Sequence, residues 1–361
     1  MWTLLLACTG PPAPPGSAPA TEPNGGDSGH SAAPIDDSGG PTTDDTATTT
    51  SPELCPTPFS GGFGEDPSFW TEPGPLAPLI LPNTLPEGDH WQLRMATSLN
   101  GGAWTPDPRV LAIHLSSLSL IETGGGFVIN VGVDALNAEP YGVGPPVDSI
   151  VVLATQDFSS FATHNLGLLG ADTHLPVDAS LWQDPDGATH AVYYNYPGEI
   201  GSGDPASWPG THWISTAEYE GGCFVEGPDI YGAEGLLDPM ICSRSDGTPW
   251  LFATGPAMSI VTVQGTESGF VHHTTWDEYT VPFCMPEGDA VFLVGQTPNG
   301  DDGLYTAAIA ASDAFVELGA LYTEEPFENC TSPVLFRRDD ELVLLCAVWT
   351  FEEGDPPPPP P

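Results

Sequence analysis

The stretch PVDASLWQDPDGATHAVYYNY at residues 176–196 reads as an apolar strand, a tight turn with Asp and Gly, and a second apolar strand. The same plan recurs in four other stretches, at 114–133, 236–255, 282–296 and 331–349. Steps of 62, 60, 45 and 49 residues separate the markers of consecutive copies, which are Leu118, Ser180, Met240, Met285 and Val334. Such steps match one four-stranded blade with variable loops, so the repeat predicts a β-propeller with five blades.

The order of a second pattern predicts how the ring closes. A third apolar strand and a turn follow two of the hairpins, at 149–161 and 303–315, and the same pattern stands before the first hairpin, at 91–104. The last hairpin, 331–349, has no such strands after it, so the N-terminal segment is expected to complete its blade and leave no free sheet edge. A β-sandwich would also have short strands with turn residues. The five hairpins and the displaced half-blade favour an all-β, five-bladed propeller over residues 88–350.

Composition divides the rest of the chain. The 42 Gly and 42 Pro and the lack of a sustained helical period agree with turn-rich β structure. Residues 9–54 are rich in Pro, Gly, Ser, Thr and Asp, which predicts a disordered acidic tether. Residues 55–87 contain Cys, Phe and Trp and are expected to pack on the propeller as an irregular lead-in. Residues 351–361 form an acidic and polyproline tail.

The first eight residues, MWTLLLAC at 1–8, end in a motif that resembles a bacterial lipobox, in which Cys8 would be lipidated. The apolar run before Cys8 is shorter than a usual signal sequence, which a start codon assigned too far downstream would explain. The prediction is a lipoprotein of the bacterial cell envelope, anchored at the outer membrane or cell surface, or a secreted protein. The alternative is a short apolar N-terminus with an incidental cysteine.

The remaining cysteines agree with export, because an even number suits an oxidising compartment. They permit up to three disulfides, and the 15 possible pairings leave the connectivity open. Cys330 and Cys346 lie on the two arms of one hairpin and form a plausible pair. No zinc-binding spacing of Cys and His occurs, so no structural metal site of that kind is expected. The six residues are Cys55, Cys223, Cys242, Cys284, Cys330 and Cys346.

The charge balance restricts the partners. The chain has 49 acidic residues against five Lys and Arg, a formal net charge of −44. Such a protein repels nucleic acid and acidic polysaccharides. The remaining partner classes are a neutral carbohydrate or an envelope protein, and the propeller is expected to be a monomer.

Two aspartates stand where inner strands are expected to begin. Aligning the hairpins on their turns places Asp178, Asp238 and Ser332 at equivalent positions, with Ser116 or Ser117 on the first blade. The two carboxylates would then face one central channel from adjacent blades. The structural alternative is that they cap the inner strands by binding backbone N–H groups.

These features resemble the five-bladed furanosidase-type glycoside hydrolases, such as arabinanases, β-xylosidases and invertases. The resemblance rests on the pair Asp238-Pro239, the hairpin turns Asp186-Gly187 and Asp246-Gly247, and the third strand at Ala96 to Ser98. It implies hydrolysis of neutral polysaccharide by three acids. In these terms Asp178 would be the base or nucleophile, Asp238 the orienting acid, and a glutamate the general acid.

The glutamate is absent from its expected place. In the fourth hairpin Met285 falls near the equivalent position, which leaves Glu287 and Glu328 as candidates. Glu328, in FENCTSP, is similar to the Glu-Cys-Pro motif of invertases, with two extra residues before the proline. The missing acid keeps two functions open: a glycoside hydrolase, and a non-catalytic propeller that binds a glycan or a protein.

Other side chains are candidates for ligand binding. No cofactor is expected, although some members of the resembled family suggest a Ca²⁺ in the channel, beside His174 in this chain. Aromatic rings stack on sugar rings, and the candidates for such stacking are Trp182, Trp208, Trp213 and Trp276.

Overall fold

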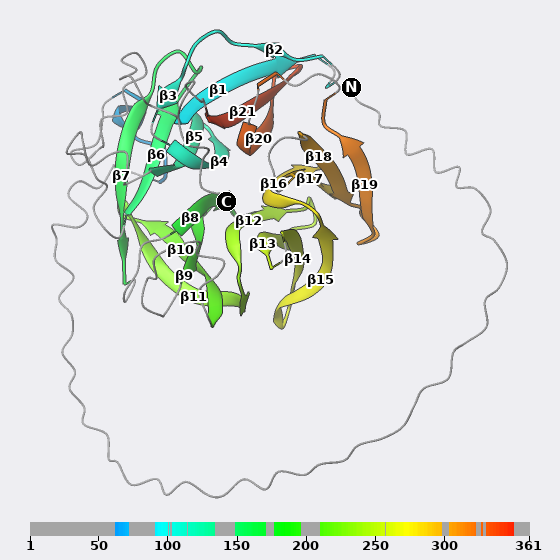
Figure 1. Ribbon diagram of the computed structural model, residues 1–361. Coiled ribbons are helices and arrows are strands. Elements are labelled where there is room, and N and C mark those ends of the chain that lie inside the picture. The colour runs from blue at the N-terminus through cyan, green and yellow to red at the C-terminus, as the bar shows by residue number, and fades with distance from the viewer. Residues whose placement is uncertain are drawn as a thin grey trace, which may run out of the picture. The chain divides into compact units, whose positions relative to one another are not determined.

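The computed structural model shows a β-propeller (Figure 1). Two compact units divide the chain, Met1–Thr49 and Thr50–Pro361, and every described residue belongs to the second. Cys8, Trp208 and Glu328 lie outside the described residues, as do the segments predicted to be tether and tail. The structure describes residues 62–71, 91–99, 101, 103–113, 115–133, 149–170, 177–195, 210–256, 258–297, 303–322, 326–327 and 330–349.

The described strands form four sheets, of which the eight-stranded one consists of two antiparallel halves joined at their outer strands by a parallel pair. Counting these halves separately gives five antiparallel sheets, each starting with a hairpin predicted from sequence. The first sheet contains β4 (Leu115–Thr123), β5 (Gly126–Val133), β6 (Ser149–Thr155) and β7 (Ala162–Leu169). The second contains β8 (Val177–Gln183), β9 (Thr189–Asn195), β10 (Thr211–Glu220) and β11 (Cys223–Glu234). The third contains β12 (Leu237–Ser243), β13 (Pro249–Gly255), β14 (Ser259–Thr266) and β15 (Gly269–Asp277). The fourth contains β16 (Thr280–Glu287), β17 (Ala290–Gln296), β18 (Leu304–Ile309) and β19 (Phe315–Ala320).

The fifth sheet joins the two ends of the propeller. It contains β20 (Cys330–Arg338), β21 (Glu341–Trp349), β1 (Trp91–Ser98), β2 (Thr105–Pro106) and β3 (Ala112–Ile113). All eight residues of β1 pair with β21, from Trp91 with Trp349 to Ser98 with Leu342. The predicted closure of the last sheet by the N-terminal segment is confirmed by this register.

The first strand of each sheet lies nearest the centre of the ring, and the fourth strands lie outside (Figure 1). Each of the inner strands β4, β8, β12, β16 and β20 contacts the next, and β20 contacts β4. Equivalent residues of neighbouring inner strands lie side by side: the Leu181 N–H on β8 donates to Ser119 Oγ on β4 at 2.8 Å. We therefore distinguish a bulge end, where the inner strands begin, from a turn end, where their hairpin turns lie.

Burial explains why the middle strands read as continuous apolar runs. In β13, six of the seven residues are buried, because neighbouring sheets cover both of its faces. The outer strands β15 and β19 are mostly exposed or half-buried. The core therefore fills the spaces between sheets near the ring's centre, and single sheets do not have a core of their own.

The described lead-in residues, 62–71, pack against the first two sheets. They include the 3-10 helix η1 (Pro67–Trp70), the only helix in the described part of the chain, and no described helix is long and apolar enough to cross a membrane. Phe63, Phe69 and Trp70 are buried beside residues of both sheets. At the outer edge of the same two sheets, β7 and β11 pair in parallel and join them into eight strands.

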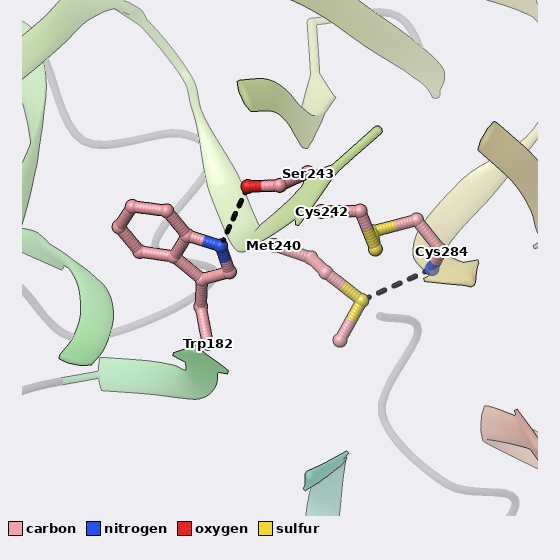
Figure 2. The surroundings of a disulfide bond; sticks show 5 residues. All are labelled: Trp182, Met240, Cys242, Ser243 and Cys284. Atoms are coloured by element: carbon pink, nitrogen blue, oxygen red, sulfur yellow. Dashed lines mark hydrogen bonds between the residues drawn. A yellow bond between two sulfur atoms is a disulfide. The ribbon is translucent and has the colours of Figure 1, made fainter. Parts of the chain in front are cut away.

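Disulfides link strands within and between sheets. Cys330 pairs with Cys346 across the fifth hairpin, as the sequence suggested. Cys242 of β12 pairs with Cys284 of β16, so this bond joins the third sheet to the fourth (Figure 2). Beside it, the Cys284 N–H contacts the Met240 sulfur at 3.1 Å. Cys223 is also disulfide-bonded, and its partner lies outside the described residues.

Candidate active site at the bulge end

Every inner strand has the same irregularity near its start. In each hairpin the inner strand advances three residues while its partner advances two, so the inner strand contains one extra residue, which is a β-bulge. The shifts lie between Leu115 and Leu118, Val177 and Ser180, Leu237 and Met240, Thr280 and Phe283, and Thr331 and Val334. The five bulges define equivalent positions independently of the hairpin turns.

Four of these bulges begin with a residue in the left-handed region of backbone conformation. The φ angles are 49° for Asp178, 46° for Asp238, 48° for Val281 and 46° for Ser332. We call these four the bulge residues. Asp tolerates this conformation better than most residues, because its short polar side chain can form local hydrogen bonds. The predicted equivalence of Asp178, Asp238 and Ser332 is confirmed by these shared bulges.

The fourth hairpin requires a correction. Its bulge residue is Val281, four residues before Met285, the position that alignment on the turns predicts. That alignment fails because the segments joining β8 to β9 and β12 to β13 are longer than the two-residue turn between Glu287 and Ala290. The fourth sheet therefore contributes no carboxyl at the bulge.

The same finding removes Glu287 from the bulge end. Its backbone pairs with Ala290 beside the hairpin turn, six residues along β16 from Val281. At the rise of an extended strand this separation is roughly 20 Å. The structure thus brings Asp178 and Asp238 together on adjacent inner strands but leaves Glu287 at the turn end. Glu328 precedes β20 in sequence and lies outside the described residues.

Asp238 is half-buried and hydrogen-bonded within the ring. The Thr254 hydroxyl on β13 donates to its carboxylate, with 2.8 Å between Oγ1 and Oδ2. The same Oγ1 accepts from the Val281 N–H, also at 2.8 Å. Thr254 therefore connects the bulge of the third sheet to that of the fourth. Sequence reasoning missed Thr254, because the equivalent residue of the second hairpin, which pairs with Val177, is Tyr194.

The surroundings of Asp238 favour its protonated form. Burial, and then the nearby negative charge of Asp178, raise the pKa of Asp238 from 3.8 to about 7, although the Thr254 hydrogen bond acts in the opposite direction. Near neutral pH, Asp238 can therefore hold a proton that an ordinary aspartate has lost. One carboxyl that retains a proton next to another is an arrangement suited to acid–base chemistry.

The described tryptophans have different environments. Trp182 is partly buried, and its ring stacks on His190. Its Nε1 donates to Ser243 Oγ at 3.1 Å (Figure 2). It therefore ties the second sheet to the third. Trp276 corrects an expectation: it is 2% exposed and packs in the core against Tyr279, so neither face of its ring is open to a sugar. Trp213 is 40% exposed.

Among the described residues, no metal site coincides with the carboxyl pair, and a cavity lies elsewhere. In the described part of the chain, no three His, Cys, Asp or Glu side chains come together as a metal site, and His174 lies outside that part. A cavity of about 1050 Å³ lies at the turn end, between the lead-in and the first two sheets. Its lining includes Trp70, Glu122 and Tyr219 but neither aspartate. The carboxyl pair and this cavity are therefore separate features.

No protein-family model and no curated protein sequence matches this chain. Solved structures similar to it include an α-L-arabinofuranosidase from Lactobacillus brevis, at 11% identity and a TM-score of 0.48, covering 67% of this chain and 86% of that one. An α-L-arabinofuranosidase from Clostridium thermocellum has 11% identity and a TM-score of 0.45, over 63% and 80% of the two chains. A GH43_1 enzyme from Xanthomonas citri complexed with xylose has 13% identity and a TM-score of 0.42, over 62% and 78%. At such low identity, the chemistry of this chain has to be judged from its own residues at the bulge end.

Proposed function

We propose that the bulge end of the ring binds neutral carbohydrate and that Asp178 and Asp238 cleave a glycosidic bond there. The observation that supports this proposal is the pair itself: two aspartates on equivalent bulges of adjacent inner strands, one with a pKa raised to about 7. Glycoside hydrolysis requires one protonated and one ionised carboxyl group. Asp238 would supply the proton to the leaving oxygen, and ionised Asp178 would stabilise the developing positive charge or activate water.

The charge of the chain supports a neutral substrate. At a formal net charge of −44, the protein would repel an anionic polysaccharide. Neutral sugars do not experience this repulsion, and their hydroxyl groups can donate hydrogen bonds to carboxylates.

Hydrolysis can be tested on linear arabinan and on aryl furanosides. We expect Asp178→Asn and Asp238→Asn each to lower kcat/KM by about 10²–10⁴-fold, the usual contribution of a general acid or base. Asp186→Asn is the matched control, because Asp186 is exposed in a hairpin turn at the other end of the same inner strand as Asp178. In the wild type, kcat/KM should fall as the pH rises past about 7, since Asp238 then loses its proton. The hydrolase proposal fails if no sugar is released, or if the Asp186 variant loses as much activity.

A second function is favoured by Val281. This residue occupies the fourth bulge, so no carboxyl from the fourth sheet joins the two aspartates. A pair without a third acid is suited to holding a glycan through hydrogen bonds without cleaving it. Calorimetry would then show binding of arabino-oligosaccharides without products, and both Asn variants would lose affinity. Release of sugar products separates the two functions. If the protein is a hydrolase, Glu328→Gln tests which acid it uses, because loss of activity with binding retained would assign the acid to Glu328 and not to Asp238.

We also propose that lipidation of Cys8 anchors the propeller at the cell envelope. The motif before Cys8 and the disulfides Cys242–Cys284 and Cys330–Cys346, which suit an oxidising compartment, support this proposal. Expression in a bacterial host from an extended upstream start should give membrane-associated protein, and Cys8→Ser should release it. Equal membrane partition of both forms would contradict the anchor.

A further inference from the structure

Trp213 is an exposed aromatic ring held flat against the second sheet. It lies on β10, directly opposite Gly232 of β11 in the pairing register. A Cβ atom at position 232 would lie 2.5 Å from Trp213 Cε3 and 2.6 Å from Cζ3, so the six-membered ring rests on the glycine backbone. The side chain is nevertheless 40% exposed. One face of the ring is therefore covered by the sheet, and its exposed surface lies on the side away from the glycine.

The strand register places this ring at the bulge end. Trp213 pairs with Asn195 at the end of β9, and the neighbouring Tyr194 pairs with Val177, the residue before Asp178. Two strand spacings, about 10 Å, separate β10 from the inner strand β8. This distance exceeds one sugar ring but is within the length of a short oligosaccharide.

A carboxylate lies one row further along the same face of the sheet. Ser215 follows Trp213 by two residues, so both side chains point to the same side of β10. Ser215 Oγ donates to Asp229 Oδ1 at 2.5 Å, and Asp229 is exposed. An open aromatic face beside a carboxylate suits both kinds of surface that a sugar presents. The C–H face of the sugar stacks on the tryptophan ring, and the sugar hydroxyl groups donate hydrogen bonds to the carboxylate oxygens.

We propose that Trp213, supported by Gly232 and flanked by Asp229, forms a second sugar-binding subsite, so that the ligand is a chain of several neutral sugar units. This inference rests on the proposed carbohydrate site at Asp178 and Asp238 and extends it outward along the second sheet. A ligand of one or two units would occupy the aspartates alone. A longer chain would reach Trp213 as well and gain affinity there.

The test measures affinity against chain length, by calorimetry with arabinobiose and with longer arabino-oligosaccharides. Trp213→Ala should weaken binding of the long ligand by about tenfold, the equivalent of one stacking contact, and leave arabinobiose unchanged. Gly232→Ala should act in the same direction, because the added Cβ lifts or tilts the ring. Leu318→Ala is the control, since Leu318 is 41% exposed on the distant strand β19. All variants are compared below their melting transitions, because Trp213 also covers the sheet.

The outcomes separate this inference from the proposed function. Asp178→Asn should weaken binding of both ligands, whereas the Trp213 and Gly232 variants should affect the long one alone. If Asp178→Asn weakens both and Trp213→Ala weakens neither, the subsite is refuted and the aspartate site stands. If no oligosaccharide binds the wild type, both proposals fail. A change in oligomeric state caused by Trp213→Ala would assign the ring to a protein contact and also refute the subsite.

Discussion

At the scale of single residues, the bulge end concentrates unfavourable contributions to folding in a small space. Asp238 has a left-handed backbone, is half-buried, and lies within the field of Asp178. A left-handed residue other than Gly costs roughly 1–2 kcal/mol, and a raised carboxyl pKa means that ionisation opposes folding. Such costs gather at functional sites more often than elsewhere. The Thr254 hydroxyl offsets part of them by donating to the carboxylate.

The pKa of Asp238 predicts how stability depends on pH. The Asp238 carboxyl keeps its proton up to about pH 7 in the folded protein but loses it near pH 3.8 in the unfolded chain. The free energy of unfolding therefore falls as the pH rises between these two values. Asp238→Asn removes this pH dependence, and asparagine also adopts the left-handed backbone conformation readily. We expect the variant to be more stable than the wild type above pH 7, by at most about 4 kcal/mol. Urea unfolding of both proteins across this pH range measures the difference in their free energies of unfolding. If the same difference persists below pH 3.8, the charge of Asp238 does not cause it.

Thr254 can be tested separately from the charge it contacts. Thr254→Val keeps the shape but removes the donor to Asp238 and the acceptor for the Val281 N–H. We expect a loss of about 1–3 kcal/mol in the free energy of unfolding, the usual cost of a buried unpaired group. The pKa of Asp238 should rise further, because this hydrogen bond lowers it. Thr254→Ser retains the hydroxyl and should leave that pKa, followed by carboxyl NMR, unchanged.

At the scale of elements, the hairpins were predictable because apolar strands and Asp-Gly turns are local signals. The third strands at 149–161 and 303–315 were found for the same reason, as β6 and β18. The bulges were not predicted, since one extra residue in a strand leaves no distinct sequence mark. The fourth hairpin was misplaced because its turn is shorter than those of the second and third, and this gave Glu287 a role that its position at the turn cannot support.

The two described disulfides should differ in their contribution to stability. Cys242–Cys284 spans 42 residues and joins two sheets, whereas Cys330–Cys346 spans 16 residues within one hairpin. Loop-closure entropy predicts losses of about 4 and about 3 kcal/mol when each pair is replaced by alanines. Denaturant unfolding of the two double variants tests this order. A larger loss from the hairpin pair would show that the link between sheets does not restrict the unfolded chain as assumed.

At the scale of the whole molecule, the ring and its closure could be predicted, because the order of repeats is independent of side-chain detail. The carboxyl pair was also predictable from two aligned aspartates. The pKa of Asp238, its link to Val281 through Thr254, and the flat ring of Trp213 on Gly232 could not be derived, since each depends on contacts between different strands. The burial of Trp276 was missed for the same reason.

Closure predicts that the propeller folds as one unit. Deleting residues 88–110 removes β1 and β2, so β21 keeps its pairing with β20 but loses its other partner from Leu342 to Trp349, and the buried side chains of Leu93 and Ala96 are lost from the core. The unpaired outward edge of β21 and an open core should prevent the whole ring from folding, with loss of the cooperative melting transition. Deleting 351–361 is the control, because β21 ends at Trp349.

A milder variant keeps this prediction testable if the deletion cannot be purified. Leu93→Ala leaves the strand in place and should cost about 2–5 kcal/mol, since Leu93 is fully buried in the largest core cluster. In a closed ring this loss should lower one shared transition, seen alike by tryptophan fluorescence and by circular dichroism. Two separate transitions, one for the fifth sheet and one for the other four, would mean that closure by β1 does not couple the sheets.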